Sequence, residues 1–559
     1  MANEKNEIKE KPIEAKIITH LNRFEVGEDI HIVKEVSYEN NKYTDDIKII
    51  KNFKRPFWVT NEAYRNHKLK KEAEDIKKVT MFKSTESNLP YAIPPRLGEE
   101  YANVNNLNIL RNSPYIYGID VDSRTFLKRY YNKKNNDHKS PYRYGAFDIE
   151  TNTIKDEIIV ISVTTNKLCN VYINKDLVKK INAPISKLME LYKKHIPDNE
   201  LKDNINVKFK IYDTELEMLM ACLKELNYLN IDICGIWNIK YDIPKIMERL
   251  DHYGVKYSDA FHYDKIPDKY KFFKFKEGQT SKLTASNKYS PINPEEQWHT
   301  VKSTTNYMFL DAMSTHRFVR TGGKTIPGGY SLGNILKHEK IPGKLYFDFE
   351  DIAGVEGSLE WHIWMVENRP LEYIIYNVWD TMSMVLLDNK TKDIKLTMPL
   401  LAGVSHFDIF NSGPKKIIDA LEFYVLGKGK VLGTKPGFSK KDDSASGGYL
   451  GLDGWINTMP SYRIDDNGIK ALIENPDLPT NIRLLTYDSD VVSSYPSCIM
   501  SANVSKDTTN REVIKIGDIP KDTFKLQNMN LMYGATNAVE YCNVMFNMPD
   551  TYELLENVA

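Results

Sequence analysis

Residues 144–165, "YGAFDIETNTIKDEIIVISVTT", constrain the fold more than any other stretch. Two apolar runs separated by a short polar turn predict two adjacent strands of a buried sheet. The segment "DTELEMLMACLKELNYL" further along has the periodicity of an amphipathic helix, so an α/β domain is expected. Side chains two positions apart share one face of a strand, so Asp148 and Glu150 should project together and could grip one cation.

Two further segments carry carboxylates. In "YNVWD", Tyr376 and Asp380 are four residues apart and would share one face of a helix. In "GIWNIKYDIPKI", Asp242 follows a predicted strand-to-helix turn that contains Asn238. Four carboxylates on three elements would suit two Mg²⁺ or Mn²⁺ ions about 3.5–4 Å apart, an arrangement that cleaves phosphodiesters. Taken alone, each pattern has a simpler interpretation: the Asp-x-Glu pair could be a solvated strand end, and Tyr-x-x-x-Asp is common on ordinary helices.

In order along the chain, "FDIET", "NIKYD" and "YNVWD" resemble the three exonuclease motifs of family B DNA polymerases. The segment "YSLGNILKHE" resembles the T-even-like phage members. The resemblance implies a 3′→5′ exonuclease of ribonuclease-H-like fold that uses two Mg²⁺ or Mn²⁺ ions. Asp148, Glu150, Asp242 and Asp380 would be metal ligands, and Tyr376 would orient the attacking water. Tyr241 stands where the family more often has Phe, and either ring is expected to pack there.

The segment "YDSDVVSSYPS" (487–497) allows two family interpretations. Its Asp-Ser-Asp is similar to the second polymerase carboxylate motif, Asp-Thr-Asp. The residues after it, however, match the first polymerase motif, and we adopt this first-motif interpretation. The resemblance then implies that Asp490 binds metal with help from the Val491 carbonyl, and that the Tyr495 ring excludes a ribose 2′-hydroxyl. Ser494 replaces the usual Leu, which bears on local packing. Asp488 and Asp490 could instead simply end a strand.

The remaining polymerase motifs do not follow. No Asp-Thr-Asp occurs between Tyr495 and Ala559, and "QNMNLMYGATN" lacks the lysine and serine of the finger motif, with Leu526 and Leu531 in their places. We interpret Asn530 to Gly534 as a turn in a palm insertion. The sequence would then be either truncated or one piece of a split polymerase, and the amphipathic pattern of "NMPDTYELLENVA" favours the split.

The length of 559 residues indicates several domains of roughly 100–200 residues each. The expected class is α/β and α+β multidomain: a mixed amino-terminal domain, the exonuclease, a helical return to the first domain and an incomplete palm. Residues 263–306 are expected to be a hairpin insertion, either solvated or stacking on bases. The expected boundaries are 1–138, 139–390, 391–425 and 426–559.

Acidic and basic residues number 76 each, so nucleic-acid binding would depend on local patches and not on net charge. Five scattered cysteines predict a reduced cytoplasmic protein, and no apolar run is long enough for a membrane span. The expected partners are single-stranded DNA, a DNA primer-template, a sliding clamp and a single-strand-binding protein, in the cytoplasm of an infected bacterial host. A dNTP would bind only with a second polymerase chain. The alternatives are a free-standing 3′→5′ exonuclease with a duplex-binding palm remnant, and a non-catalytic clamp module.

Overall fold

A computed structural model of the protein describes residues 12–39, 42–68, 70–283, 288–322 and 326–435. The chain divides into two units, Met1–Gly437 and Phe438–Ala559, and the described residues all belong to the first. Within these ranges no helix is both long enough and apolar enough to cross a bilayer.

The amino-terminal region consists of two small antiparallel sheets and helix α5. The strands of the first sheet are β1 (Glu14–Leu21), β2 (Ile30–Glu39) and β3 (Lys42–Lys51). Those of the second are β6 (Val79–Ser84), β4 (Arg55–Thr60) and β7 (Ile116–Tyr117). Helix α5 (Ser123–Lys134) begins at Asp122, whose side chain accepts a hydrogen bond from the Thr125 amide. Leu127 and Tyr131 of α5 pack on the first sheet, so a local capping signal and an apolar stripe together fix this helix.

A six-stranded mixed sheet forms the centre of the next region, in the order β11-β10-β9-β8-β12-β17. Its strands are β8 (Tyr144–Asn152), β9 (Glu157–Thr165), β10 (Leu168–Asn174), β11 (Asn206–Tyr212), β12 (Ile233–Ile236) and β17 (Met308–Asp311). Strand β9 is antiparallel to both of its neighbours, whereas the β10-β11, β8-β12 and β12-β17 pairs are parallel. The two adjacent buried strands predicted over residues 144–165 are therefore confirmed as β8 and β9.

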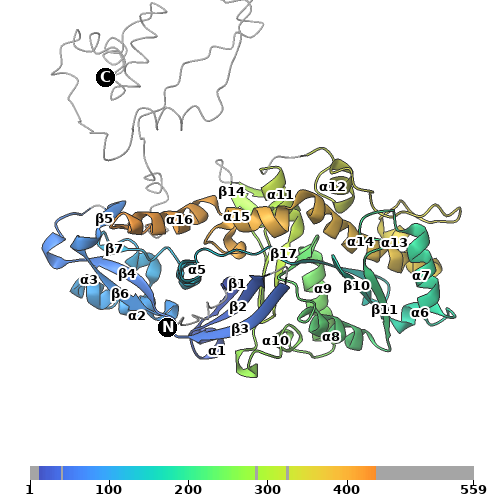
Figure 1. The fold of residues 1–559 in the computed structure, drawn as a ribbon, viewed down its shortest axis with the longest axis horizontal. Helices are drawn as coiled ribbons and strands as arrows, with labels where there is room; N and C mark the ends of the chain where they lie inside the picture. The colour runs from blue at the N-terminus through green and yellow to red at the C-terminus, as the bar shows by residue number, and fades with distance from the viewer. Residues whose placement is uncertain (1–11, 40–41, 69, 284–287, 323–325, 436–559) are drawn as a thin grey trace, which may run out of the picture. The chain divides into compact units, whose positions relative to one another are not determined.

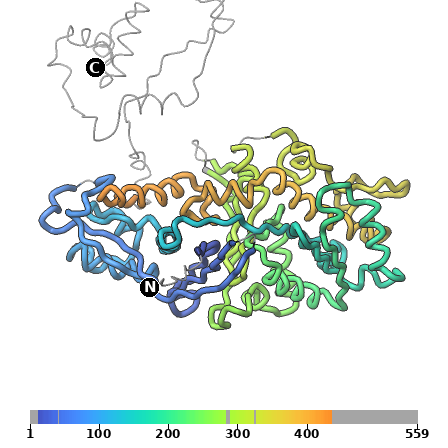
Figure 2. The backbone as a smooth tube through the Cα atoms, viewed as in Figure 1, coloured from blue at the N-terminus to red at the C-terminus, as the bar shows by residue number. Residues whose placement is uncertain are grey.

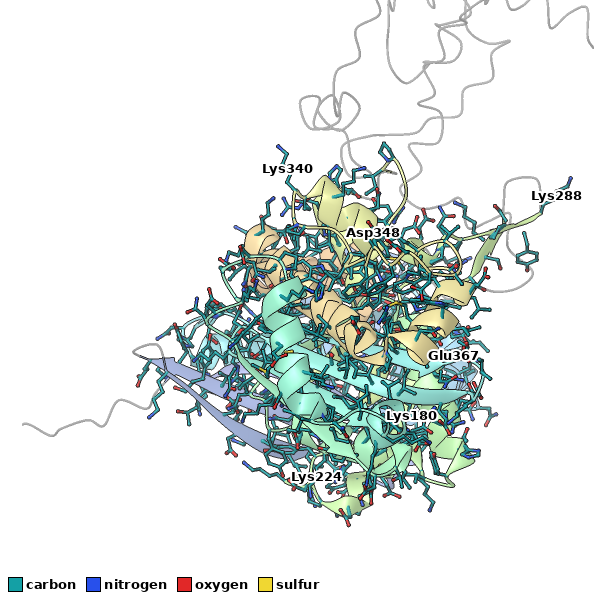
Figure 3. The ribbon with its side chains drawn as sticks, turned by 90° about the vertical axis from the view of Figure 1, so that its right-hand side faces the viewer. Lys180, Lys224, Lys288, Lys340, Asp348 and Glu367 are labelled. Carbon is teal, nitrogen blue, oxygen red and sulfur yellow. The ribbon has the colours of Figure 1, made fainter. Side chains whose placement is uncertain are left out.

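Helices cover both faces of this sheet (Figure 1). The two on one face are α7 (Pro184–His195) and α14 (Pro370–Thr391), and those on the other are α8 (Glu215–Leu226) and α9 (Ile239–His252). Val160 of β9 packs in the first core and Ile161 in the second, because successive strand residues face opposite sides. Burial of both faces explains why strands such as β9 are nearly continuously apolar. Charged side chains such as Lys180, Lys224 and Glu367 lie on the outside (Figure 3).

The expected hairpin insertion is confirmed as two short antiparallel pairs. Strand β13 (Phe273–Lys276) pairs with β16 (Thr300–Ser303), and β14 (Ser281–Leu283) pairs with β15 (Tyr289–Pro291). The base of the hairpin is not fully solvated, since Phe273 and Phe275 pack against the core beside α8 and α9.

After α14 the chain runs back to the amino-terminal region. Helices α15 (Met398–Ala402) and α16 (Gly413–Gly427) lead to β18 (Lys430–Leu432), which pairs antiparallel with β5 (Ala73–Asp75). Figure 2 shows this last described part of the tube beside the amino-terminal strands. Phe423 and Leu426 of α16 pack on Trp58 and Tyr117, so segments distant in sequence share one small core. The expected domain boundaries themselves stay a prediction.

The remaining helices are short or connect these layers. They are α1 (Arg23–Val26), α2 (Leu89–Ala92), α3 (Pro94–Leu97), α4 (Leu107–Leu110), α6 (Lys175–Val178), α10 (Tyr257–Ala260), α11 (Ala312–Arg320), α12 (Leu332–His338) and α13 (Leu359–Asn368).

A buried ion pair ties the amino-terminal region to the central sheet. Lys34 of β2 places its ammonium 2.9 Å from Asp232, which precedes β12, and the carboxylate of Asp232 also accepts from the Arg143 guanidinium. Burial alone would raise the pKa of Asp232, but Lys34 and Arg143 hold it below its usual value. The two regions are thus joined by paired charges as well as by apolar contacts.

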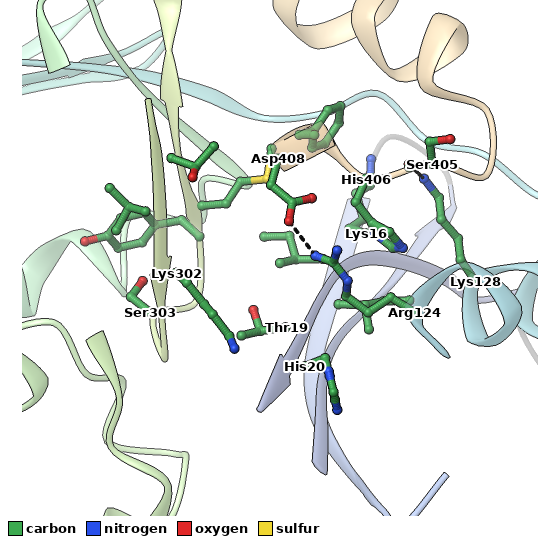
Figure 4. A pocket seen from close by; sticks show the side chains of 17 residues that line it. Lys16, Thr19, His20, Arg124, Lys128, Lys302, Ser303, Ser405, His406 and Asp408 are labelled. Carbon is green, nitrogen blue, oxygen red and sulfur yellow. Dashed lines mark hydrogen bonds and ion pairs between the residues drawn. The ribbon is translucent and has the colours of Figure 1, made fainter. Parts of the chain in front are cut away.

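A basic pocket lies where the amino-terminal region, the hairpin and residues 405–408 meet (Figure 4). Its volume is about 120 Å³, and its cationic side chains already have partners. Arg124 donates to Asp408, Lys128 to the Ser405 carbonyl and Lys302 to a glutamate. These three cations therefore have hydrogen-bond partners within the protein.

Candidate active site

Strand β8 presents the first two carboxylates of the candidate site. Phe147 and Ile149 are buried beneath α8 and α9, so Asp148 and Glu150 project from the opposite face toward α14. The pairing of β8 with β9 shifts register between Glu150 and Thr151. Such bulges bend a strand and re-aim its side chains, often next to active sites.

Helix α14 supplies the other side of the site. Its residues Tyr373, Asn377 and Asp380 are spaced by four and three positions, which places them on one helix face. The Asn377 amide donates to Asp148 Oδ2 at 2.7 Å, and the Tyr373 hydroxyl donates to Glu150 Oε2 at 2.6 Å. These two hydrogen bonds dock the helix directly on the carboxylates of β8.

Three carboxylates converge as the sequence predicted. One oxygen from each of Asp148, Glu150 and Asp380 lies within 4.8 Å of the others. Asp380 is only 3% exposed, and its Oδ1 atom is buried without a hydrogen-bond partner. Burying a carboxylate oxygen with no partner is costly, so this oxygen is suited to a ligand.

Asp242 lies beside this group, in the first turn of α9, directly after the predicted turn at Asn238. It is 2% exposed, and its Oδ2 atom is also buried without a partner. Its charge is one cause of the raised pKa of Asp148, so the two carboxylates interact. Asp242, the fourth predicted carboxylate, therefore lies next to the cluster of Asp148, Glu150 and Asp380 but is not one of the three residues whose oxygens lie within 4.8 Å of each other.

Burial and the closeness of several negative charges together determine the electrostatics of the site. Burial, and then the charges of Asp242, Glu150 and Asp380, raise the pKa of Asp148 well above its usual value. Burial raises the pKa of Glu150 to about 7, although the hydrogen bond from Tyr373 acts in the opposite direction. Several carboxylates cannot all ionise in a buried site without added positive charge. The donor set is all oxygen, so the residues fit hard divalent cations such as Mg²⁺ or Mn²⁺.

Part of that charge comes from Lys344, which the sequence interpretation missed. Its ammonium donates to Asp380 Oδ2 at 2.7 Å and to the Tyr376 hydroxyl at 2.6 Å. Although burial lowers the pKa of Lys344, Asp380 and Tyr376 hold it well above its usual value. Lys344 lies in the segment after α12, outside every quoted motif, so no spacing rule could have found it.

Tyr241 and Tyr376 differ in their surroundings. Tyr376 is 2% exposed and points, with Asp380, toward Lys344, as their spacing of four predicted. Tyr241 is 44% exposed, so the expectation that its ring packs into the protein is wrong. Its hydroxyl instead lies 2.9 Å from Thr151 Oγ1, which links the start of α9 to the end of β8. A phenylalanine could not make this bond.

The predicted palm residues Asp490, Val491 and Tyr495 lie outside the described residues, as do Asp488 and Ser494.

Comparison with protein families gives one match, which covers part of the chain. Residues 103–313 match the exonuclease domain of DNA polymerase family B. A search of curated proteins found no match. The matched segment contains Asp148, Glu150 and Asp242 and ends before Tyr376 and Asp380, which the structure brings to the same site. The chain therefore contains a family B DNA polymerase exonuclease region.

Proposed function

We propose that this protein is the 3′→5′ proofreading exonuclease part of a T-even-like phage replicative DNA polymerase. The observation that carries the proposal is the convergence of Asp148, Glu150 and Asp380 oxygens within 4.8 Å, next to the buried Asp242. The family match to an exonuclease domain supports it. Two features of the central sheet support a ribonuclease-H-like fold: its strand order, and strand β9, which is antiparallel to both of its neighbours.

The four carboxylates would hold two Mg²⁺ or Mn²⁺ ions. Such ions supply Lewis-acid stabilisation of a phosphodiester and lower the pKa of an attacking water. Asn377 and Tyr373 orient the carboxylates of β8 through the hydrogen bonds described above. Tyr376 accepts a hydrogen bond from Lys344 and also interacts with Asp380, which places its hydroxyl at the carboxylate site, where it would orient the attacking water. The Lys344 ammonium adds a positive charge where the transition state gains negative charge.

The full chain with Mg²⁺ or Mn²⁺ should degrade single-stranded DNA from its 3′ end. Combining Asp148→Ala with Glu150→Ala should abolish cleavage, because the loss of metal ligands forfeits several kcal/mol of transition-state stabilisation. Asp198→Ala is the control, since that side chain is 99% exposed and remote from the motifs. Undiminished cleavage by the double variant would refute the assignment. Tyr376→Phe should lose less activity, because the ring remains.

The polymerase part of the proposal depends on the sequence of residues 487–497 alone. Asp490 would bind metal and Tyr495 would exclude ribonucleotides. A nucleotidyl-transfer site needs at least two carboxylates, and the first-motif interpretation assigns only Asp490, so a second carboxylate has to be supplied. We propose that a second chain with the fingers, the Asp-Thr-Asp motif and the thumb supplies it. A primer-template, a sliding clamp and a single-strand-binding protein, in the cytoplasm of an infected bacterium, would be its partners.

A further inference from the structure

A chain of hydrogen-bonded side chains ends on Glu150. The Tyr373 hydroxyl lies 2.6 Å from Glu150 Oε2, and His362 Nδ1 lies 2.7 Å from the same hydroxyl. His362 belongs to α13 and Tyr373 to α14, so two helices reach one carboxylate of β8. Neither residue is part of a motif in the sequence analysis.

The direction of these hydrogen bonds follows from the donors available. An ionised Glu150 carboxylate can only accept, so the single hydroxyl proton of Tyr373 points at Glu150. The hydroxyl oxygen is then the acceptor for His362, which must carry its proton on Nδ1. Glu150 therefore sets the orientation of the Tyr373 hydroxyl, and a proton on His362 Nδ1 is compatible with it.

Packing holds the two rings in place. Tyr373 is 1% exposed and stacks nearly parallel on Tyr376, with ring centroids 5.9 Å apart. The His362 ring meets the edge of the fully buried Trp361 at 4.9 Å. Because the buried Tyr373 ring cannot swing away without opening this core, its hydroxyl is a fixed donor for Glu150.

We propose that Tyr373 and His362 are positioning residues that fix the Glu150 carboxylate so that one of its oxygens stays within reach of Asp148 and Asp380. This inference rests on the proposed function, since it assigns Glu150 to a metal site. Hydrogen-bond partners of this kind typically change metal affinity or activity by about 10–100-fold when they are removed.

The same sheet offers a matched control. Tyr172 of β10 is buried and donates to Glu225 Oε2 at 2.7 Å, so Tyr172→Phe removes a tyrosine-to-glutamate hydrogen bond of the same kind. That bond connects β10 to α8 and does not involve the cluster of Asp148, Glu150 and Asp380. Any general cost of deleting a buried hydroxyl should therefore be seen in both variants.

The experiment measures Mn²⁺ binding to the full chain by electron paramagnetic resonance of the free ion, alongside exonuclease rates. Tyr373→Phe should weaken Mn²⁺ binding about 10-fold, and Tyr172→Phe should bind like the wild type. His362→Ala should act in the same direction as Tyr373→Phe. His362→Asn should restore binding, because its amide nitrogen can donate from nearly the position of Nδ1. Circular dichroism checks that each variant is folded.

The outcomes separate the two proposals. If Glu150→Gln weakens Mn²⁺ binding while Tyr373→Phe binds like the wild type, the positioning role is refuted and the metal site stands. If Glu150→Gln also binds Mn²⁺ like the wild type, the metal site and the positioning role both fail. Equal losses in Tyr373→Phe and Tyr172→Phe, or no difference between His362→Ala and His362→Asn, would likewise overturn the positioning role.

Discussion

The ammonium nitrogen of Lys344 lies 2.7 Å from Asp380 Oδ2, so a cation is built into the carboxylate site. Its charge lowers the pKa values of Asp148, Glu150, Asp242 and Asp380, against the burial that raises them. One lysine cannot neutralise four carboxylates, so the site still favours the binding of further positive charge. The same ammonium donates a hydrogen bond to the Tyr376 hydroxyl. Lys344 therefore both compensates the charge of Asp380 and orients a proposed catalytic group.

Replacing Lys344 should therefore affect the reaction more than metal binding. We expect Lys344→Met to lower the exonuclease rate roughly 100-fold, because an oriented donor and a charge near the phosphate are both lost. Mn²⁺ affinity should be unchanged or higher, since a like charge has been removed. Lys340→Met, at an exposed lysine nearby (Figure 3), should match the wild type in both measurements. A loss of Mn²⁺ binding in Lys344→Met would contradict this assignment.

Glu150 should make stability depend on pH when divalent cations are absent. Burial raises its pKa to about 7 from a usual 4.5, so the folded protein binds more protons than the unfolded chain between these values. Stability from this group is therefore present at low pH and lost as pH rises through about 7. In EDTA, the stability of Glu150→Gln relative to wild type should rise by at most about 3 kcal/mol between pH 5 and pH 8.

Chemical denaturation at several pH values measures this difference, and Glu248→Gln, at an exposed glutamate, is the control. Parallel pH profiles for Glu150→Gln and wild type would show that the carboxylate is not destabilised. Adding Mg²⁺ should return stability to the wild-type protein, because a ligand that binds only the folded state stabilises it.

The buried pair that joins the amino-terminal region to the central sheet should matter for stability. Lys34→Met leaves the Asp232 carboxylate, which is 0% exposed, with less compensation. Breaking one side of a buried pair typically costs about 3–5 kcal/mol. Lys175→Met is the matched control, because its pair with Asp213 is exposed and such pairs contribute roughly 0–1 kcal/mol. Equal unfolding midpoints for the two variants would show that the buried pair is not needed.

The polymerase proposal has its own test. The purified chain should show no primer extension, and extension should begin when a second polypeptide with the fingers and the Asp-Thr-Asp motif is added. Asp490→Ala should then eliminate extension and leave exonuclease activity intact, because the two sites use different carboxylates. Tyr495→Ala should relax discrimination against ribonucleotides. Synthesis at the unmutated rate by Asp490→Ala would mean that this segment is only a strand end and a turn.

The sequence predicted the parts of the site that depend on local periodicity. Alternation along β8 placed Asp148 and Glu150 on one face, and the helical spacing of Tyr376 and Asp380 did the same on α14. Tyr373 and Asn377 were missed although each lies three residues before a motif residue, so the same helical rule could have found them.

Lys344 and His362 were beyond such rules. Each comes from a segment that reaches the site only through the packing of α12 and α13 against α14, and no spacing in the sequence encodes that contact. The exposed ring of Tyr241 was also missed, because the choice between packing and a hydrogen bond to Thr151 depends on where β8 ends relative to α9.

The pairing of β5 with β18 has a consequence for synthesis on the ribosome. Residues 73–75 leave the ribosome long before residues 430–432, and the whole central sheet is translated between them. The edge of β5 that receives β18 therefore stays unpaired until residues 430–432 have been translated, after all four carboxylates of the site. Exposed strand edges invite pairing with other chains, and β5 limits this risk because it has only three residues, of which two are acidic.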